Sequence, residues 1–245
     1  MEIVTLAARL DLGPKLWDLQ SEWPEFMRHD PVADLYYEDI ESRWSDWALI
    51  AIDGDQVAAR GFCVTFAMGA DIKRPVLPSD GWDSVIRWSC LDRLKGHEPT
   101  AVSALEITVD PVYRGTGLAA DMVRAMRDNA SRHGFSSLVV PVRPSRKHLE
   151  PETPMHEYAG RVRPDGLPED PWLRVHVRLG AEIVRICPTS MTIPGTLAQW
   201  RGWTGLPFDT SGLVVVPDAL VPVHVDVEQN HAVYVEPNVW LRHHW

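Results

Sequence analysis

The sequence predicts an α/β (α+β) fold, in which helices flank a central mixed sheet. Two observations carry this prediction. A strand, a glycine-containing turn and an amphipathic helix follow one another over residues 104–127, and Asp53-Gly54 joins two apolar runs in the manner of a β-hairpin. With 245 residues, the chain is long enough to bury a full core, as one large or two small domains.

The first part of the chain is predicted to form two helices and the hairpin. Apolar residues recur at helical spacing over residues 12–29, where Pro24 interrupts the pattern, and over residues 33–44. The apolar runs 47–52 and 56–66 follow, and the Asp-Gly pair between them is one of the strongest short-range hairpin signals. A proline-containing loop then leads to a further helix.

That further helix is predicted over residues 82–94, and Gly96 ends it. Beyond it, apolar and polar residues alternate along a strand until Asp110-Pro111 stops the pattern. From Leu118 onward, apolar residues take up helical spacing again. The turn between strand and helix contains two glycines, which let a ligand approach the backbone closely. The amide groups and the dipole of a helix start favour a phosphate or pyrophosphate there.

Two known phosphate-binding motifs were compared with this turn: the Walker loop does not fit it, and the dinucleotide fingerprint fits it in part. A Walker loop requires Gly-Lys-Ser/Thr, but Gly117 is followed by Leu118. The run Gly115-x-Gly117-x-x-Ala120 satisfies the dinucleotide fingerprint, although five residues separate it from the strand. The fingerprint also expects an acidic residue after the next strand, where Arg143 stands. Because arginine suits the additional phosphate of NADP, an NADP-dependent oxidoreductase remains an alternative.

The pattern Arg114-x-x-Gly117-x-Ala119 resembles the acyl-CoA site of the GNAT acyltransferase superfamily, since a strand and Asp-Pro precede it and an amphipathic helix follows. The resemblance implies that backbone amides of this turn hold the pyrophosphate of coenzyme A. It also implies acetyl-CoA, or another acyl-CoA, as the co-substrate. The residues that it places at coenzyme A are Ile107, Val109, Arg114, Gly115, Thr116, Gly117, Leu118, Ala119 and Ser145.

Two departures from the resembling family concern the acceptor side. The helix at 82–94 replaces a tight connection, so it is either part of that side or a packing insertion. The polar, proline-rich stretch 147–170, with a short helix at 155–162, is long for a connection. It is either a lid over the site or a solvated excursion. As a lid, it would bring His156-Glu157-Tyr158 to the acceptor.

The remaining elements alternate between strands and helices. Residues 137–143 read as a strand, and Asp170-Pro171 starts a helix that Gly180 ends. Residues 173–179 also alternate like a strand, but the capping signals favour the helix. A strand follows at 182–187.

We expect residues 1–193 to form the GNAT-like domain, with a core at about 47–187, and residues 194–245 to pack on it as an extension. The extension is expected to extend the sheet, build the acceptor pocket or contact a second copy of the chain in a homodimer. Its predicted elements are a helix at 196–203 and strands at 213–216, 220–227 and 231–235.

Acyl transfer from a thioester to an amine needs one proton removed from the nucleophile and one delivered to the departing thiolate. The resemblance implies a carboxylate base on the strand before the turn, and Glu106 lies there; an exposed structural glutamate is the alternative. The family's usual acid is a tyrosine four residues before the glycine that ends the later helix. Here His176 stands at that distance from Gly180, and imidazolium can donate a proton.

Composition excludes several other classes of protein. The net charge is −10, which argues against nucleic acid as the main partner. No apolar run is long enough to cross a membrane. The cysteines Cys63, Cys90 and Cys187 are far apart and read as reduced core residues, so we expect a cytoplasmic protein. The histidines show no set of metal ligands, and no metal is expected.

The sequence as a whole therefore predicts an acyl-CoA-dependent N-acyltransferase, most simply one that moves acetyl to an amine of a small molecule. A non-catalytic module that binds acyl-CoA is the second hypothesis. It is favoured if neither Glu106 nor His176 faces the thioester. The oxidoreductase is the third hypothesis, and it is favoured if Arg143 lies beside the glycine turn.

Overall fold

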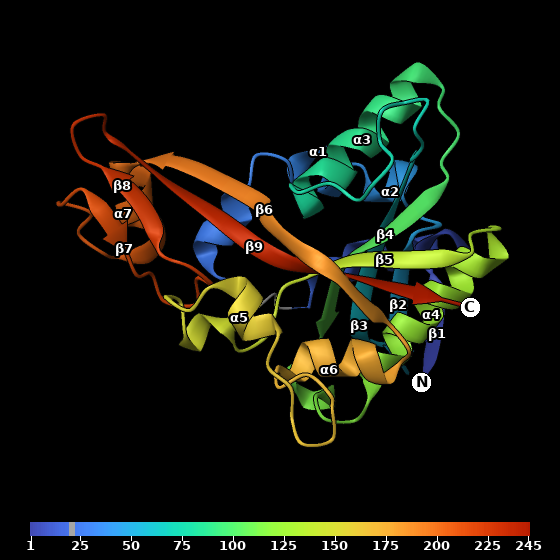
Figure 1. Ribbon diagram of the computed structural model, residues 1–245. Coiled ribbons are helices and arrows are strands. Elements are labelled where there is room, and N and C mark those ends of the chain that lie inside the picture. Colours follow the sequence, from blue (N-terminus) through green and yellow to red (C-terminus); the bar gives the residue numbers. More distant parts are fainter. Residues whose placement is uncertain (20–22) are drawn as a thin grey trace.

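A computed structural model describes residues 1–19 and 23–245, and in them one nine-stranded sheet runs through the whole molecule (Figure 1). The strands follow the order β1-β2-β3-β4-β5-β9-β8-β7, and β6 pairs with β9. Most neighbours are antiparallel, as expected for hairpins and meanders. The strands are β1 (Glu2–Thr5), β2 (Ala48–Asp53), β3 (Gln56–Phe66), β4 (Ala101–Val109), β5 (Ser137–Val142), β6 (Glu182–Thr196), β7 (Gly212–Val214), β8 (Val223–Asp226) and β9 (His231–His244).

Helices cover both faces of the sheet (Figure 1). On one face lie α1 (Asp34–Tyr37), α2 (Ile40–Arg43) and α3 (Gly81–Lys95), and on the other lie α4 (Leu118–Arg132) and α6 (Pro171–Arg178). Each face has its own apolar core. Phe62 and Val64 of β3 belong to the core under α3, whereas Met122 and Met126 of α4 pack in the other core, against β-strand residues such as Cys63.

The parallel strands β4 and β5 are paired over a very short length and then separate. A single pair of residues, Ser103 and Val139, is in register between these strands. The rest of β4 runs on to Val109 paired with β3 alone. A cavity lies at this opening, because residues of both strands line it. The split sheet therefore positions the site described below.

Most of the predicted elements are confirmed. The hairpin β2–β3, helix α3, strand β4, helix α4 and strand β5 lie where the sequence predicted them. The short helix α5 (Met155–Ala159) and helix α7 (Leu197–Thr204) also form. The capping signals predicted a helix at 171–179 and the alternation predicted a strand, and the structure has the helix, α6. Asp170 Oδ1 accepts hydrogen bonds from the amides of Trp172 and Leu173 at 2.9 and 3.1 Å, and these bonds fix the first turn of α6.

Some predictions about elements need correction, and one strand was missed. The helix over 12–29 is wrong. The described residues form only 3₁₀ turns (Leu10–Leu12, Pro14–Trp17 and Glu25–His29), since Gly13-Pro14 and Pro24 restart the chain, and residues 20–22 lie outside the description. The helix over 33–44 divides into α1 and α2. Strand β1 was not predicted.

The extension builds part of the sheet. Strand β9 lies between β5 and β6, and its Val239 is in register with Val142 of β5 and with Ile186 of β6. The predicted strand 231–235 was much too short, because Pro237 interrupts the sequence signal that the real strand passes through. The far end of the β6–β9 ribbon carries β7, β8 and α7 (Figure 1). A contact between two copies of the chain stays a prediction.

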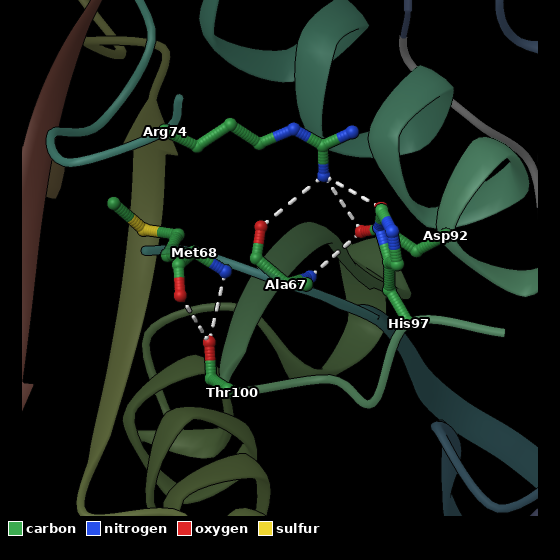
Figure 2. Close-up of polar contacts among 6 residues, drawn as sticks. All are labelled: Ala67, Met68, Arg74, Asp92, His97 and Thr100. Atoms are coloured by element: carbon green, nitrogen blue, oxygen red, sulfur yellow. Dashed lines mark hydrogen bonds and ion pairs between the residues drawn. The ribbon is translucent and has the colours of Figure 1, made fainter. Parts of the chain in front are cut away.

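The inserted loop before α3 is fixed by a buried carboxylate, as Figure 2 shows. Asp92 of α3 accepts a hydrogen bond from the amide of Ala67 at 2.7 Å and one from Arg74 Nη1 at 2.7 Å. The Thr100 hydroxyl accepts a hydrogen bond from the Met68 amide and donates one to the Met68 carbonyl. These bonds tie the insertion to the ends of β3 and β4, and α3 in turn holds Trp82 beside the site.

Among the described residues, no helix is long and apolar enough to span a bilayer.

Candidate active site

A cavity of about 750 Å³ occupies the opening between β4 and β5. One wall is β4 from Ala104 to Val109, and the other is β5 with Arg143 and Ser145 after it. The turn before α4 contributes Arg114, and α6 contributes Val175 and His176. The cavity is therefore open to the glycine turn at one side and to α6 at another, as a site for a long, jointed ligand would be.

The glycine turn has the backbone conformation that its glycines permit. Gly115 has a φ of 76° and Gly117 a φ of 95°, both in the left-handed region. Gly117 is the N-cap of α4, so the first amides of that helix have no partners within the helix. Asp110 shapes the turn by accepting a hydrogen bond from the Val112 amide at 2.9 Å. Unpaired amides at the start of a helix are groups to which anions commonly bind.

The predicted coenzyme A residues are brought to one region, but they do not all reach the cavity with their side chains. Ile107, Val109, Arg114, Ala119 and Ser145 line it. Leu118 is instead buried in the core under the sheet, so that only its backbone is available to a ligand. Gly115, Thr116 and Gly117 form the turn itself. Their part in binding stays a prediction.

Glu106 lies at the centre of the site as a buried, ion-paired carboxylate. Its side chain is 3% exposed and that of its partner Arg60 is 5% exposed. Oε1 of Glu106 accepts hydrogen bonds from Arg60 Nε at 3.0 Å and from the Thr108 hydroxyl at 2.6 Å. Oε2 accepts one from the Tyr37 hydroxyl at 2.6 Å. The exposed-glutamate alternative is wrong, and Oε2 keeps the acceptor capacity that a ligand can use.

His176 lines the cavity, but its surroundings do not suit an imidazolium acid. The side chain is buried, and its Nδ1 lies 2.9 Å from Nε2 of His243 on β9. Burial, together with the neighbouring His243, lowers the pKa of His176 to about 3. Near neutral pH the imidazole is therefore uncharged. A part for His176 in proton transfer therefore stays a prediction, and it would have to start from the neutral ring.

A second cavity, of about 450 Å³, adjoins the first. The two share four lining residues, namely Trp23, Trp82, Glu106 and Met191. Four aromatic residues and two carboxylates are among the residues that line the second cavity. Its other lining residues include Trp17, Tyr37, Asp34, Arg28 and Arg60. Glu106 therefore lines both cavities.

The sequence missed the second cavity. It is assembled from 3₁₀ turns, α1, β3 and the start of α3, and no motif connects these segments. The only signal was the unusual number of tryptophans, eleven in all. The predicted acceptor contacts lie elsewhere: His156 and Glu157 are exposed, and the Tyr158 hydroxyl donates to Asp170 at 2.9 Å. None of these three lines either cavity.

The guanidinium of Arg143 is already bound by protein groups, so it is not placed to bind a phosphate. Its Nε donates to Glu236 at 3.0 Å, and its guanidinium also donates to the carbonyl of Asp218. Glu236 is fully buried and raises the pKa of Arg143, although burial itself opposes that rise. The arginine is thus part of the wall between β5 and β9, which removes the observation that favoured an NADP site.

Comparison with known proteins agrees with this geometry. No protein-family model matches the sequence. The chain is 35% identical, over 267 aligned positions, to the arginine N-acetyltransferase avaD of Aspergillus versicolor, with 98% of this chain and 92% of that protein covered. Solved structures share its fold as well, and two of them are described here.

One of them is the loading GNATL domain of CurA from Lyngbya majuscula, with a TM-score of 0.57, 14% identity and coverage of 99% of this chain and 96% of that one. The other is the GphF GNAT-like decarboxylase in complex with isobutyryl-CoA, with a TM-score of 0.50, 17% identity and coverage of 100% and 99%. Both likenesses concern the fold.

The split sheet, the glycine turn beside it and the cavity in the split are compatible with an enzyme that uses acyl-CoA. The chain belongs to the GNAT superfamily of acyl-CoA N-acyltransferases. It is an acyl-CoA-dependent N-acetyltransferase, and the oxidoreductase and the non-catalytic module are set aside.

Proposed function

We propose that this enzyme transfers acetyl from acetyl-CoA to the α-amino group of arginine or of a compound that carries an arginine side chain. Coenzyme A would occupy the larger cavity and the glycine turn, and the acceptor would occupy the smaller cavity. The name of the Aspergillus versicolor relative supports arginine as the acceptor. The observation that carries the proposal is that Glu106 lines both cavities.

The smaller cavity has the chemistry that a guanidinium requires. Flat cations pack well on indole faces, and the cavity presents Trp17, Trp23 and Trp82. The enzyme's own Arg60 illustrates this, since its guanidinium carbon lies 5.0 Å from the ring centroid of Trp17. Asp34 supplies a carboxylate on the same cavity. The net charge of −10 also attracts a cationic acceptor.

With the guanidinium between the tryptophans, the amino group of the acceptor comes to Glu106. Oε2 of Glu106 accepts a bond from Tyr37 and has room for one more donor, which the amine or a water molecule on it would supply. We therefore propose that Glu106 orients the amine and takes its proton through water. The amine nitrogen then attacks the thioester carbon, and the C–S bond breaks.

On the coenzyme side, the amides of the glycine turn and of Leu118 and Ala119 would hold the pyrophosphate, with Arg114 beside it. Ile107 and Val109 on β4 and Ser145 after β5 would face the pantetheine arm. The cysteines Cys63, Cys90 and Cys187 are unpaired thiols, and on this ground we also propose a cytoplasmic location.

Replacing Asp34 by asparagine should raise KM for arginine about tenfold and change kcat little, because a charge contact to a remote part of the acceptor is lost. The measurement is thiol release from acetyl-CoA, with the product identified by mass spectrometry. Asp39→Asn is the matched control, because Asp39 pairs with Arg43 at 2.9 Å and does not line the cavity.

Citrulline tests the acceptor assignment itself, because it has the shape of arginine without the charge. We expect arginine to be acetylated far more efficiently than citrulline. Equal efficiency for the two, or an unchanged KM in Asp34→Asn, would refute a guanidinium site in the smaller cavity.

A further inference from the structure

The histidine pair at α6 and β9 is a buried polar unit beside the larger cavity. His176 is 2% exposed and His243 is fully buried. Their rings lie 5.2 Å apart between centroids, and Trp172 packs edge-on against His176 at 4.5 Å. The pair joins the helix that lines the cavity to the last strand of the chain. Two histidines in hydrogen-bond contact are therefore held rigidly at the edge of the site.

Nε2 of His176 and Nδ1 of His243 are both buried, and neither has a hydrogen-bond partner among the described residues. An unpartnered buried polar atom costs roughly 1–3 kcal/mol, and such atoms are rare in folded proteins. His176 lines the cavity and His243 does not. The free nitrogen of His176 is therefore the part of the pair that a ligand in the cavity would satisfy.

The state of the pair follows from its surroundings. Burial and the guanidinium of Arg127 on α4 lower the pKa of His243 to about 4, while the carbonyl of Leu179 at the end of α6 opposes this. His176 titrates lower still, for the reasons given above. Both rings are thus neutral at neutral pH, and each carries a single N–H. One ring donates to the other across the 2.9 Å contact.

We infer that His243 is a positioning residue, whose Nε2–H donates to Nδ1 of His176 and so leaves the Nε2–H of His176 to the reacting end of acyl-CoA. The thioester offers only acceptors, namely its carbonyl oxygen and its sulfur, so the nitrogen that meets it has to donate. A neutral imidazole can polarise a carbonyl in this way. The inference rests on acetyl transfer but not on the identity of the acceptor.

The proton balance of the reaction then needs no imidazolium. The amine nitrogen forms a bond to the thioester carbon and loses its proton through a water molecule to Glu106. The C–S bond breaks, and the sulfur leaves as a thiolate that accepts the hydrogen bond from His176. Since a free thiol has a pKa near 8.5, the thiolate takes a proton from solvent after release. The histidine pair contributes a fixed N–H hydrogen-bond donor, and its protonation state is the same before and after the reaction.

Nitrogen-15 NMR on protein labelled at histidine tests the tautomer without any acceptor. We expect His176 to be neutral at pH 7, with a protonated Nε2 and a bare Nδ1. A bare Nε2 or an imidazolium at pH 7 would overturn the inference.

The matching activity test compares three variants. His243→Ala should lower kcat about a hundredfold, as misplaced catalytic groups do, and leave the Kd for coenzyme A within about twofold. His243→Gln should recover part of the loss, because its amide N–H can donate to Nδ1 of His176. His244→Ala is the control, since that exposed neighbour pairs with Glu182 at the surface.

An unchanged kcat per folded molecule in His243→Ala would show a purely structural pair. The pH profile adds an independent readout. An imidazolium donor would lose activity as pH rises through its pKa, whereas a neutral pair predicts no such fall between about pH 5 and 8. These readouts use any accepted amine, so a failure of the arginine assignment would leave them intact.

Discussion

Replacing Gly117 by aspartate should weaken the binding of coenzyme A at least a hundredfold. The substitution brings a negative charge to the N-terminus of α4, where the pyrophosphate is proposed to lie, and charges of one sign repel strongly at this range. It also forces a side chain into the left-handed backbone at a φ of 95°. The measurement is isothermal titration of the folded variant with coenzyme A.

Two controls separate charge from backbone strain. Gly117→Asn places a side chain of the same size there without the charge, and it should lose much less affinity. Gly134→Asp introduces an aspartate at a φ of 85° beyond the other end of α4, where we expect coenzyme A to bind normally. Coenzyme A binding to Gly117→Asp as tight as to the parent would show that the phosphates lie elsewhere.

Replacing Arg60 by methionine should lower the free energy of unfolding by about 3–5 kcal/mol, which is the usual effect of leaving one buried charge without its partner. The pair with Glu106 is almost fully buried, and Arg60 also donates to the carbonyl of Leu16 at 2.8 Å. Urea unfolding at pH 7 measures the change. The smaller cavity should lose its shape in the same variant, because Arg60 lines it.

The double variant Arg60→Met/Glu106→Gln tests the cause. It should be more stable than Arg60→Met alone, since it no longer buries an unpaired carboxylate. Arg124→Met removes an exposed pair with Asp121 and should change stability by less than about 1 kcal/mol. If Arg60→Met unfolded at the same urea concentration as the parent, the buried pair would not be what fixes Glu106.

Local signals decided which elements could be predicted. Asp53-Gly54 marked the hairpin, Asp170-Pro171 marked α6, and the pattern from Arg114 to Ala119 marked the glycine turn. Each of these acts within a few residues, so each is visible in a sequence. Where the chain uses short 3₁₀ turns, as before Pro24, helical spacing was misleading, because the same apolar residues face the core from turns.

Long-range contacts decided what could not be predicted. Arg60 sits in the middle of the apolar run of β3, and only the pairing with β4 brings it to Glu106. The contact between His243 and His176 could not be predicted, because the last strand was predicted to end before Pro237 and so did not include His243. The smaller cavity depends on rings contributed by distant segments. Contacts between residues that are far apart in the sequence cannot be read from their positions along the chain.

The most direct test of the two-cavity account is the affinity of a bisubstrate compound, in which coenzyme A is joined through an acetyl linker to the α-amino group of arginine. If the cavities meet at Glu106 and hold the two substrates together, this compound should bind at least about a hundredfold more tightly than coenzyme A alone. The advantage should shrink when citrulline replaces arginine in it. An affinity equal to that of coenzyme A would contradict the account.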